Sequence, residues 1–86
     1  MKYIVMEDER GNKDIFVFPR NINHDCMAEM LKGIKDQTRG NWERVFRKPV
    51  SAGFVNKSLT CYGSSESLGI SSCPGDTDLL RKEMEK

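Results

Sequence analysis

The chain has 86 residues, with 14 Lys and Arg against 13 Asp and Glu, one His, three Cys and 37% hydrophobic residues. This length allows one small domain over residues 1–86 and excludes a second hydrophobic core. The formal net charge of +1 argues against a protein whose whole surface attracts nucleic acid or anionic membranes. No apolar run approaches the roughly 20 residues of a membrane-spanning helix. The odd number of Cys, without paired spacing, favours a reducing cytoplasmic location over a secreted disulfide scaffold.

Two short β-type runs open the chain, Lys2–Glu7 and Asp14–Phe18. Gly11-Asn12 between them can adopt the positive φ angles of a hairpin connection, so we predict a β-hairpin. Both runs are apolar on both faces, because side chains alternate along a strand and none of the central positions is polar. The hairpin is therefore expected at the centre of a sheet, or with its second face against another element or subunit.

A helix is predicted from His24 to about Lys35, with Asn23 as its N-cap. Ile22 and Met27 have the spacing of a hydrophobic staple, in which residues on either side of the cap pack together. Apolar residues recur at three- and four-residue steps and form one stripe: Met27, Met30, Leu31 and Ile34.

The segment after this helix resumes β character at Val45-Phe46. Pro49 cannot donate a ladder hydrogen bond, so we expect an edge strand or a bend there. Apolar and small residues alternate over residues 50–55, and Asn56-Lys57 is a predicted two-residue turn into a strand over residues 58–62. This pattern predicts a second hairpin.

A closing helix is predicted after Pro74, because Pro suits a first helical turn and Asp76 and Asp78 suit its positive end. The predicted order is ββαββα, an α+β fold with an antiparallel sheet of two hairpins, one packed central helix and a C-terminal helix. The expected core contains Ile4 or Met6, Phe16 or Phe18, Met27, Leu31, Ile34, Phe54 and Leu59.

Two stretches carry a resemblance, Val50-Ser51-Ala52-Gly53-Phe54-Val55 and Cys61-Tyr62-Gly63-Ser64-Ser65-Glu66-Ser67-Leu68-Gly69. They resemble a group of small uncharacterised bacterial proteins that are often encoded on prophages and other mobile elements. The resemblance implies a single compact domain, and it assigns no functional residue.

The cysteines and the single histidine do not have the spacing of a metal site. His24 and Cys26 are two residues apart on the predicted helix and point away from each other, and no CxxC or CxxH pair occurs. We therefore expect no bound metal, with Cys26 and Cys61 as small buried side chains. Cys73 stands just before Pro74, where a helix dipole favours thiolate, although Asp76 and Asp78 oppose that effect. It is expected to be partly exposed and chemically idle.

Two polar segments can be interpreted either as ordinary solvated surface or as functional sites. Glu7, Asp8 and Glu9 are expected as solvated acids of the hairpin turn, because a catalytic pair needs a cleft with apolar walls. The segment Gly63–Gly69 has the glycines and hydroxyls of a phosphate loop, but it lacks the Gly-Lys-Ser/Thr ending and Glu66 would repel phosphate. A compact polar loop is the simpler interpretation, and it is the first place to look for a small-ligand site.

Positive charge is concentrated over residues 32–57, which contain seven Lys and Arg against two acidic residues. An aromatic residue among basic ones is the chemistry of single-strand stacking, whereas a solvated edge strand protected by Lys and Arg shows the same pattern. The candidate nucleic-acid contacts are Arg39, Trp42, Arg44, Arg47 and Lys48.

No catalytic set and no cofactor motif stands out. We therefore expect a non-enzymatic protein-binding or regulatory module with an unknown protein partner, and the apolar second face of the first hairpin leaves a homodimer open. The alternative is a nucleic-acid-binding accessory protein that uses the basic segment 32–57. No interaction with a membrane is expected.

Overall fold

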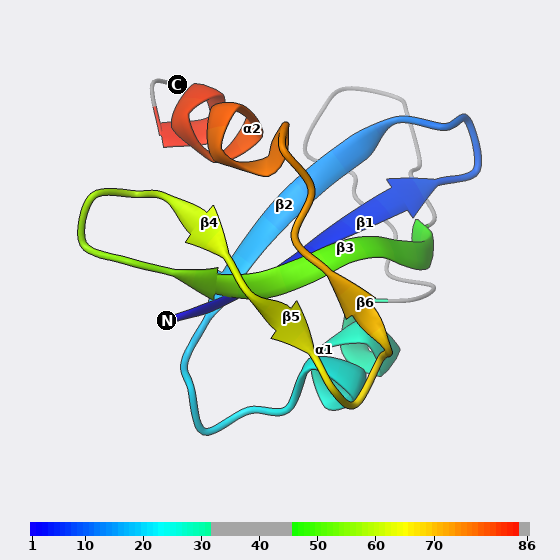
Figure 1. The fold of residues 1–86 in the computed structure, drawn as a ribbon. Coiled ribbons are helices and arrows are strands. Elements are labelled where there is room, and N and C mark those ends of the chain that lie inside the picture. The colour runs from blue at the N-terminus through cyan, green and yellow to red at the C-terminus, as the bar shows by residue number, and fades with distance from the viewer. Residues whose placement is uncertain (32–45, 85–86) are drawn as a thin grey trace.

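A computed structural model describes residues 1–31 and 46–84, and it confirms the α+β class. A four-stranded antiparallel sheet has the strand order β2-β1-β3-β4, and β5 and β6 form a separate two-stranded sheet (Figure 1). The elements of the described residues are β1 (Lys2–Asp8), β2 (Lys13–Phe18), α1 (His24–Leu31), β3 (Phe46–Val55), β4 (Cys61–Tyr62), β5 (Ser64–Ser65), β6 (Ile70–Ser71) and α2 (Asp76–Met84).

The first hairpin is confirmed, with Lys2 opposite Phe18 and Glu7 opposite Lys13. Gly11 has a φ of 85°, as the predicted turn requires. The expectation that Asp8 is a solvated acid is wrong, because it is buried at the end of β1. Its Oδ1 accepts hydrogen bonds from the backbone N–H groups of Arg10 and Asn12, each at 2.9 Å. These two hydrogen bonds to the Asp8 carboxylate stabilise the turn between β1 and β2.

The third strand is paired on one side only around Pro49, as the prediction of an edge strand or bend there requires. β3 runs from Phe46 to Val55 and pairs with β1 along most of its length, whereas β4 pairs only with Phe54 and Val55. The pairing with β1 shifts where Val5 is opposite Ser51 and Met6 is opposite Pro49. One residue of β3 is therefore unpaired there, and such a bulge tolerates a residue that cannot donate a ladder hydrogen bond.

The predicted pairing of the second hairpin is confirmed, but the predicted two-residue turn is wrong. Val55 is opposite Cys61 and Phe54 is opposite Tyr62, so β4 contains only two residues. Residues 56–60 connect the strands in place of the predicted two-residue turn, with Leu59 at a φ of 59°. The Asn56 side chain holds this connection, because its Oδ1 accepts from the backbone N–H groups of Ser58 and Thr60.

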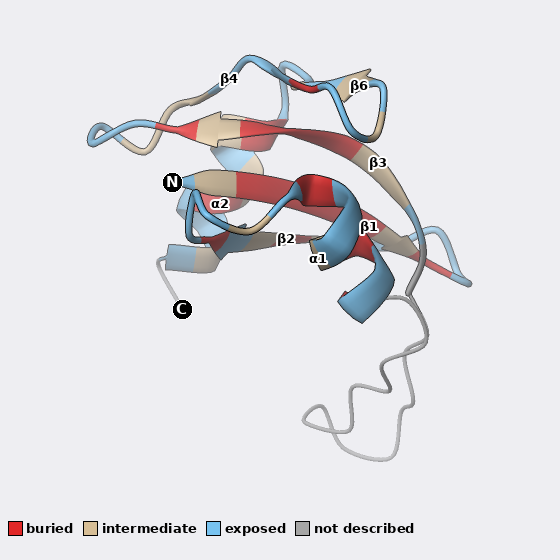
Figure 2. Ribbon diagram, turned by 90° about the horizontal axis from the view of Figure 1, so that it is seen from below, coloured by how far each residue is buried: buried red, intermediate tan, exposed pale blue. Residues whose placement is uncertain are grey.

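The two helices cover opposite faces of the sheet (Figures 1 and 2). β1 supplies buried side chains to both faces, since Ile4 and Met6 pack under α1 whereas Tyr3 and Val5 pack under α2. The helices contribute Ala28 and Leu31 on one face and Leu80 on the other. The second apolar face of the hairpin is thus covered within the chain, which removes the argument that it needs a second subunit.

The predicted core is confirmed in most of its members. Phe18 and Leu31 are buried with Ile4 and Met6. Phe16, Ile22 and Met27 are partly buried and pack against this cluster. The prediction is wrong for Leu59, which packs against the cluster of Leu80 under α2. It is also wrong for Phe54, which is half-buried and lies against His24 outside both clusters. Ile34 lies outside the described residues.

α1 begins at His24 as predicted and is described to Leu31; its predicted continuation to about Lys35 lies outside the described residues. Among the described helices, none has the length and the apolar composition that a bilayer crossing requires.

Candidate functional site

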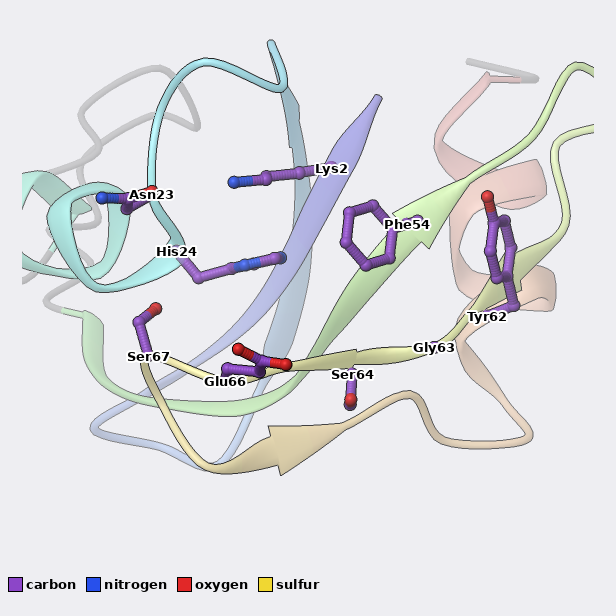
Figure 3. A pocket seen from close by; sticks show the side chains of 9 residues that line it. All are labelled: Lys2, Asn23, His24, Phe54, Tyr62, Gly63, Ser64, Glu66 and Ser67. Carbon is purple, nitrogen blue, oxygen red and sulfur yellow. The ribbon is translucent and has the colours of Figure 1, made fainter.

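A cleft of about 740 Å³ opens where the start of α1 faces the second hairpin (Figure 3). Its walls come from four parts of the chain: the start of β1, the start of α1, the end of β3, and the segment from β4 through the β5–β6 turn. Its volume lies in the range of about 300–1,000 Å³ that is typical of small-ligand sites. The lining residues are Lys2, Asn23, His24, Phe54, Tyr62, Gly63, Ser64, Glu66 and Ser67.

His24 forms the floor of the cleft and is only 4% exposed. Its Nε2 lies 2.9 Å from the carbonyl oxygen of Gly53, and since a carbonyl oxygen only accepts, Nε2 carries the proton. The ring contacts Phe18 and Phe54 edge to face, with centroid distances of 5.4 and 5.9 Å. The imidazole therefore fastens α1 to β3 and gives the cleft a rigid base.

The aromatic wall of the cleft depends on two glycines. Phe54 and Tyr62 lie side by side, with ring centroids 5.9 Å apart and the rings tilted by 33°. A Cβ on Gly53 would overlap the carbonyl oxygen of Tyr62, so only glycine lets β4 approach β3 this closely. Gly63 has a φ of 81°, and a Cβ there would lie 3.0 Å from the Phe54 ring. The chain therefore turns directly against the face of Phe54.

The polar side of the cleft joins α1 to the β5–β6 turn. The backbone N–H of Asp25 donates to Ser67 Oγ at 3.2 Å, which closes one end of the cleft. Lys2 reaches over from β1, and its Nζ donates to the carbonyl oxygen of Ile22 at 3.0 Å. Glu66 is exposed on the turn. The cleft thus combines an aromatic wall with one cation, one carboxylate and several hydrogen-bonding groups.

A second polar cluster lies on the other face of the sheet, where Asp76 is only 5% exposed at the start of α2. Its Oδ2 accepts from the hydroxyl of Tyr3 at 2.5 Å and from the backbone N–H of Cys73 at 2.9 Å. Its Oδ1 accepts from the hydroxyl of Ser51 at 3.0 Å. Burial and the hydrogen bond to Asp76 raise the pKa of Tyr3 well above its usual value. This cluster is closed to substrates and anchors α2 to the sheet.

The cysteines do not meet His24. Cys26 is exposed on α1, which corrects its expected burial, because it points away from the side of the helix that buries His24, Ala28 and Leu31. Cys61 is half-buried, and burial together with the nearby Asp76 carboxylate raises the pKa of its thiol. Cys73 is exposed, and its backbone N–H donates to the Asp76 carboxylate. Within residues 1–31 and 46–84, no group of three His, Cys, Asp or Glu is arranged to hold a metal ion.

Most of the candidate nucleic-acid contacts lie outside the described residues. Arg39, Trp42 and Arg44 lie outside the described residues, and of Arg47 only its place in β3 is described. Lys48 is exposed, with its Nζ 3.9 Å from Glu7 Oε1. A nucleic-acid interface over residues 32–57 therefore stays a prediction.

The sequence indicated one wall of the cleft and missed the rest. The segment Gly63–Gly69, the first place to look for a small-ligand site, contributes four lining residues to the cleft. Lys2, His24 and Phe54 were interpreted as strand or helix residues, and no local pattern connects them, because they are 22 to 52 positions apart.

Comparison of the chain with protein-family models, with curated proteins and with solved structures finds no match.

Proposed function

We propose that the protein is a non-enzymatic binding module that recognises a protein partner through the cleft. The observation that carries the proposal is the exposed aromatic wall. Tyr62 is 44% exposed and rests against Phe54, which gives the cleft a rigid apolar surface beside polar groups. Protein-binding surfaces are enriched in such tyrosines, because the ring buries a large area at a small cost in side-chain entropy.

The polar groups of the cleft support binding more than catalysis. A general base needs a free nitrogen or oxygen that a second side chain orients toward the substrate. The ring of His24 is only 4% exposed and its Nε2–H is held by a backbone carbonyl, that of Gly53, whereas Glu66 stands on an exposed turn. Ser67 is engaged by the backbone of Asp25. These bonds hold the walls in place, which favours recognition of a preformed shape.

The test is affinity capture from a lysate of the organism that encodes the protein, with Tyr62→Ala as the cleft variant. Tyr62 has an exposed side chain, so its truncation should leave the fold intact, which a thermal melt checks. Met30→Ala is the matched control, because Met30 is 61% exposed on α1 and does not line the cleft. We expect the wild type and Met30→Ala to retain the same partner protein after nuclease treatment, and Tyr62→Ala to lose it.

Two results would contradict the proposal. Equal capture by both variants would show that the partner does not use the cleft. Loss of the partner on nuclease treatment would favour the nucleic-acid hypothesis, which a titration of labelled single-stranded oligonucleotides at low salt then examines through Trp42 fluorescence. If Arg39, Arg44, Arg47 and Lys48 contact phosphates, the affinity should fall with salt with a log–log slope of about −3.

A further inference from the structure

The two charges of the cleft have opposite signs and come from different walls. Lys2 extends from β1 on one side of His24, and Glu66 stands on the β5–β6 turn on the other side (Figure 3). Lys2 is half-buried and bonded to a neutral carbonyl oxygen, that of Ile22. Within the described residues neither Lys2 nor Glu66 forms an ion pair. The cleft therefore presents a positive and a negative pole to whatever enters it.

The aromatic wall stands beside these poles, with Phe54 next to His24 and Tyr62 beyond Phe54 (Figure 3). A flat apolar group entering the cleft can pack on these rings, since aromatic pairs prefer offset or edge-on contact at about 4.5–7 Å between centroids. Ser64 and Asn23 line the same space, and their backbone and side-chain groups include both donors and acceptors. This arrangement matches an aromatic side chain on a peptide backbone.

We propose that the cleft takes a short peptide segment in which one aromatic side chain stands between an acidic and a basic residue. The aromatic side chain packs on Phe54 and Tyr62, the acidic residue pairs with Lys2, and the basic residue pairs with Glu66. The proposal rests on the proposed function and names the chemistry of the partner. A peptide can supply both charges, whereas a nucleic acid is a polyanion that Glu66 would repel.

The test uses four fluorescently labelled peptides with capped ends, whose binding is followed by fluorescence anisotropy at low salt. The first has the core Asp-Gly-Phe-Gly-Lys between Gly-Ser spacers. The second has Ala in place of Phe, the third has two Asp, and the fourth has two Lys. We expect the purified wild-type protein to bind the first peptide at least tenfold more tightly than each of the other three.

Charge variants of the protein make the test specific to the cleft. Glu66→Lys should move the preference to the peptide with two Asp, because both poles are then positive, and Lys2→Glu should move it to the peptide with two Lys. Glu9→Lys is the matched control for Glu66→Lys, since Glu9 is exposed in the β1–β2 turn and the change in net charge is the same. The control should keep the preference for the peptide that carries both charges.

The proposal is overturned if the four peptides bind within twofold of one another, or if Glu66→Lys and Glu9→Lys alter the preference equally. It is also overturned if a single-stranded oligonucleotide binds more tightly than any peptide and loses that binding in Tyr62→Ala. Lysate capture that depends on Tyr62, combined with peptides that do not discriminate, would refute this peptide chemistry and leave the proposed function standing. Capture that does not depend on Tyr62 would refute the proposed function itself.

Discussion

Asp76 shows how a single buried charge holds the C-terminal helix on the sheet. A buried carboxylate is costly unless donors surround it, and here the hydroxyls of Tyr3 and Ser51 and the backbone N–H of Cys73 do so. The start of α2 adds the positive end of the helix dipole. The carboxylate therefore links β1, β3 and α2 at one point.

The first prediction is that Asp76→Ala destabilises the protein by about 2–5 kcal/mol, because two buried hydroxyls and one backbone N–H lose their acceptor. Asp76→Asn should cost less, since its amide retains one acceptor oxygen. Urea unfolding measures both free energies. Asp78→Ala is the matched control, because Asp78 is exposed on the same helix and should cost below about 1 kcal/mol. Similar losses for Asp76→Ala and Asp78→Ala would contradict the anchoring role.

The second prediction concerns stability at high pH. Burial and the hydrogen bond to Asp76 raise the pKa of Tyr3 far above its usual value of about 10. Above pH ~10 the unfolded phenol loses its proton while the folded one keeps it, so the unfolded state binds fewer protons. The free energy of unfolding should then fall as pH rises, by up to about 1.4 kcal/mol per pH unit. Below pH ~10 this contribution is fully present.

Tyr3→Phe should flatten that decline in urea titrations between pH 8 and 11, and it should cost about 1.5–3 kcal/mol at neutral pH through the lost hydrogen bond to a carboxylate. Tyr62→Phe, which removes an exposed phenol, is the matched control. The raised pKa of Cys61 acts with the same sign, so Cys61→Ser is measured in parallel. An unchanged slope in Tyr3→Phe would show that Tyr3 is not the group that titrates.

At the scale of elements, each described helix buries one leucine in the core on its own face of the sheet, Leu31 on α1 and Leu80 on α2. Truncating either to Ala leaves a cavity in the core on its own face of the sheet, and the expected cost is about 2–5 kcal/mol. In so small a domain, that loss is a large part of the total stability. Met30 and Met84 are the controls, because both are exposed on the same helices and their truncation should cost below about 0.5 kcal/mol.

Urea unfolding of a double variant also shows whether the cores on the two faces of the sheet are energetically coupled. Leu31 and Leu80 belong to separate clusters, so the free energies of the two substitutions should add in the double variant. A cost below about 0.5 kcal/mol for Leu80→Ala would mean that α2 does not cover its face, and that the second apolar face needs another partner.

At the scale of the molecule, both faces of the central hairpin are covered within one chain, so we expect a monomer of 9.9 kDa in sedimentation velocity. The remaining apolar surface includes a groove of about 380 Å³ beside α2, with Val17 and Met84 at its exposed rim. A concentration-dependent dimer would contradict the expectation, and Val17→Ser, which makes this rim polar, would then show whether the groove forms the contact.

Local patterns in the sequence determined the parts of the fold that depend on neighbours along the chain. Apolar runs on either side of Gly11 were enough for the first hairpin, and Asn23 before an apolar stripe was enough for the start of α1. Each signal lies within one turn of helix or a few strand residues, where backbone propensity and side-chain alternation decide the structure. The α+β class follows from the order of these elements.

Only the tertiary structure decided which polar residues are buried and which residues share the cleft. Asp76 is buried because Tyr3, 73 positions earlier, and Ser51, 25 positions earlier, donate to it. Pro49 stands in a continuous strand because the register with β1 shifts beside it. Lys2 and Glu66 line one cleft although they are 64 positions apart, and Gly53 lets β4 approach β3 closely beside it. No local spacing encodes these results, since the stability of a buried polar group depends on donors that only the folded chain brings near.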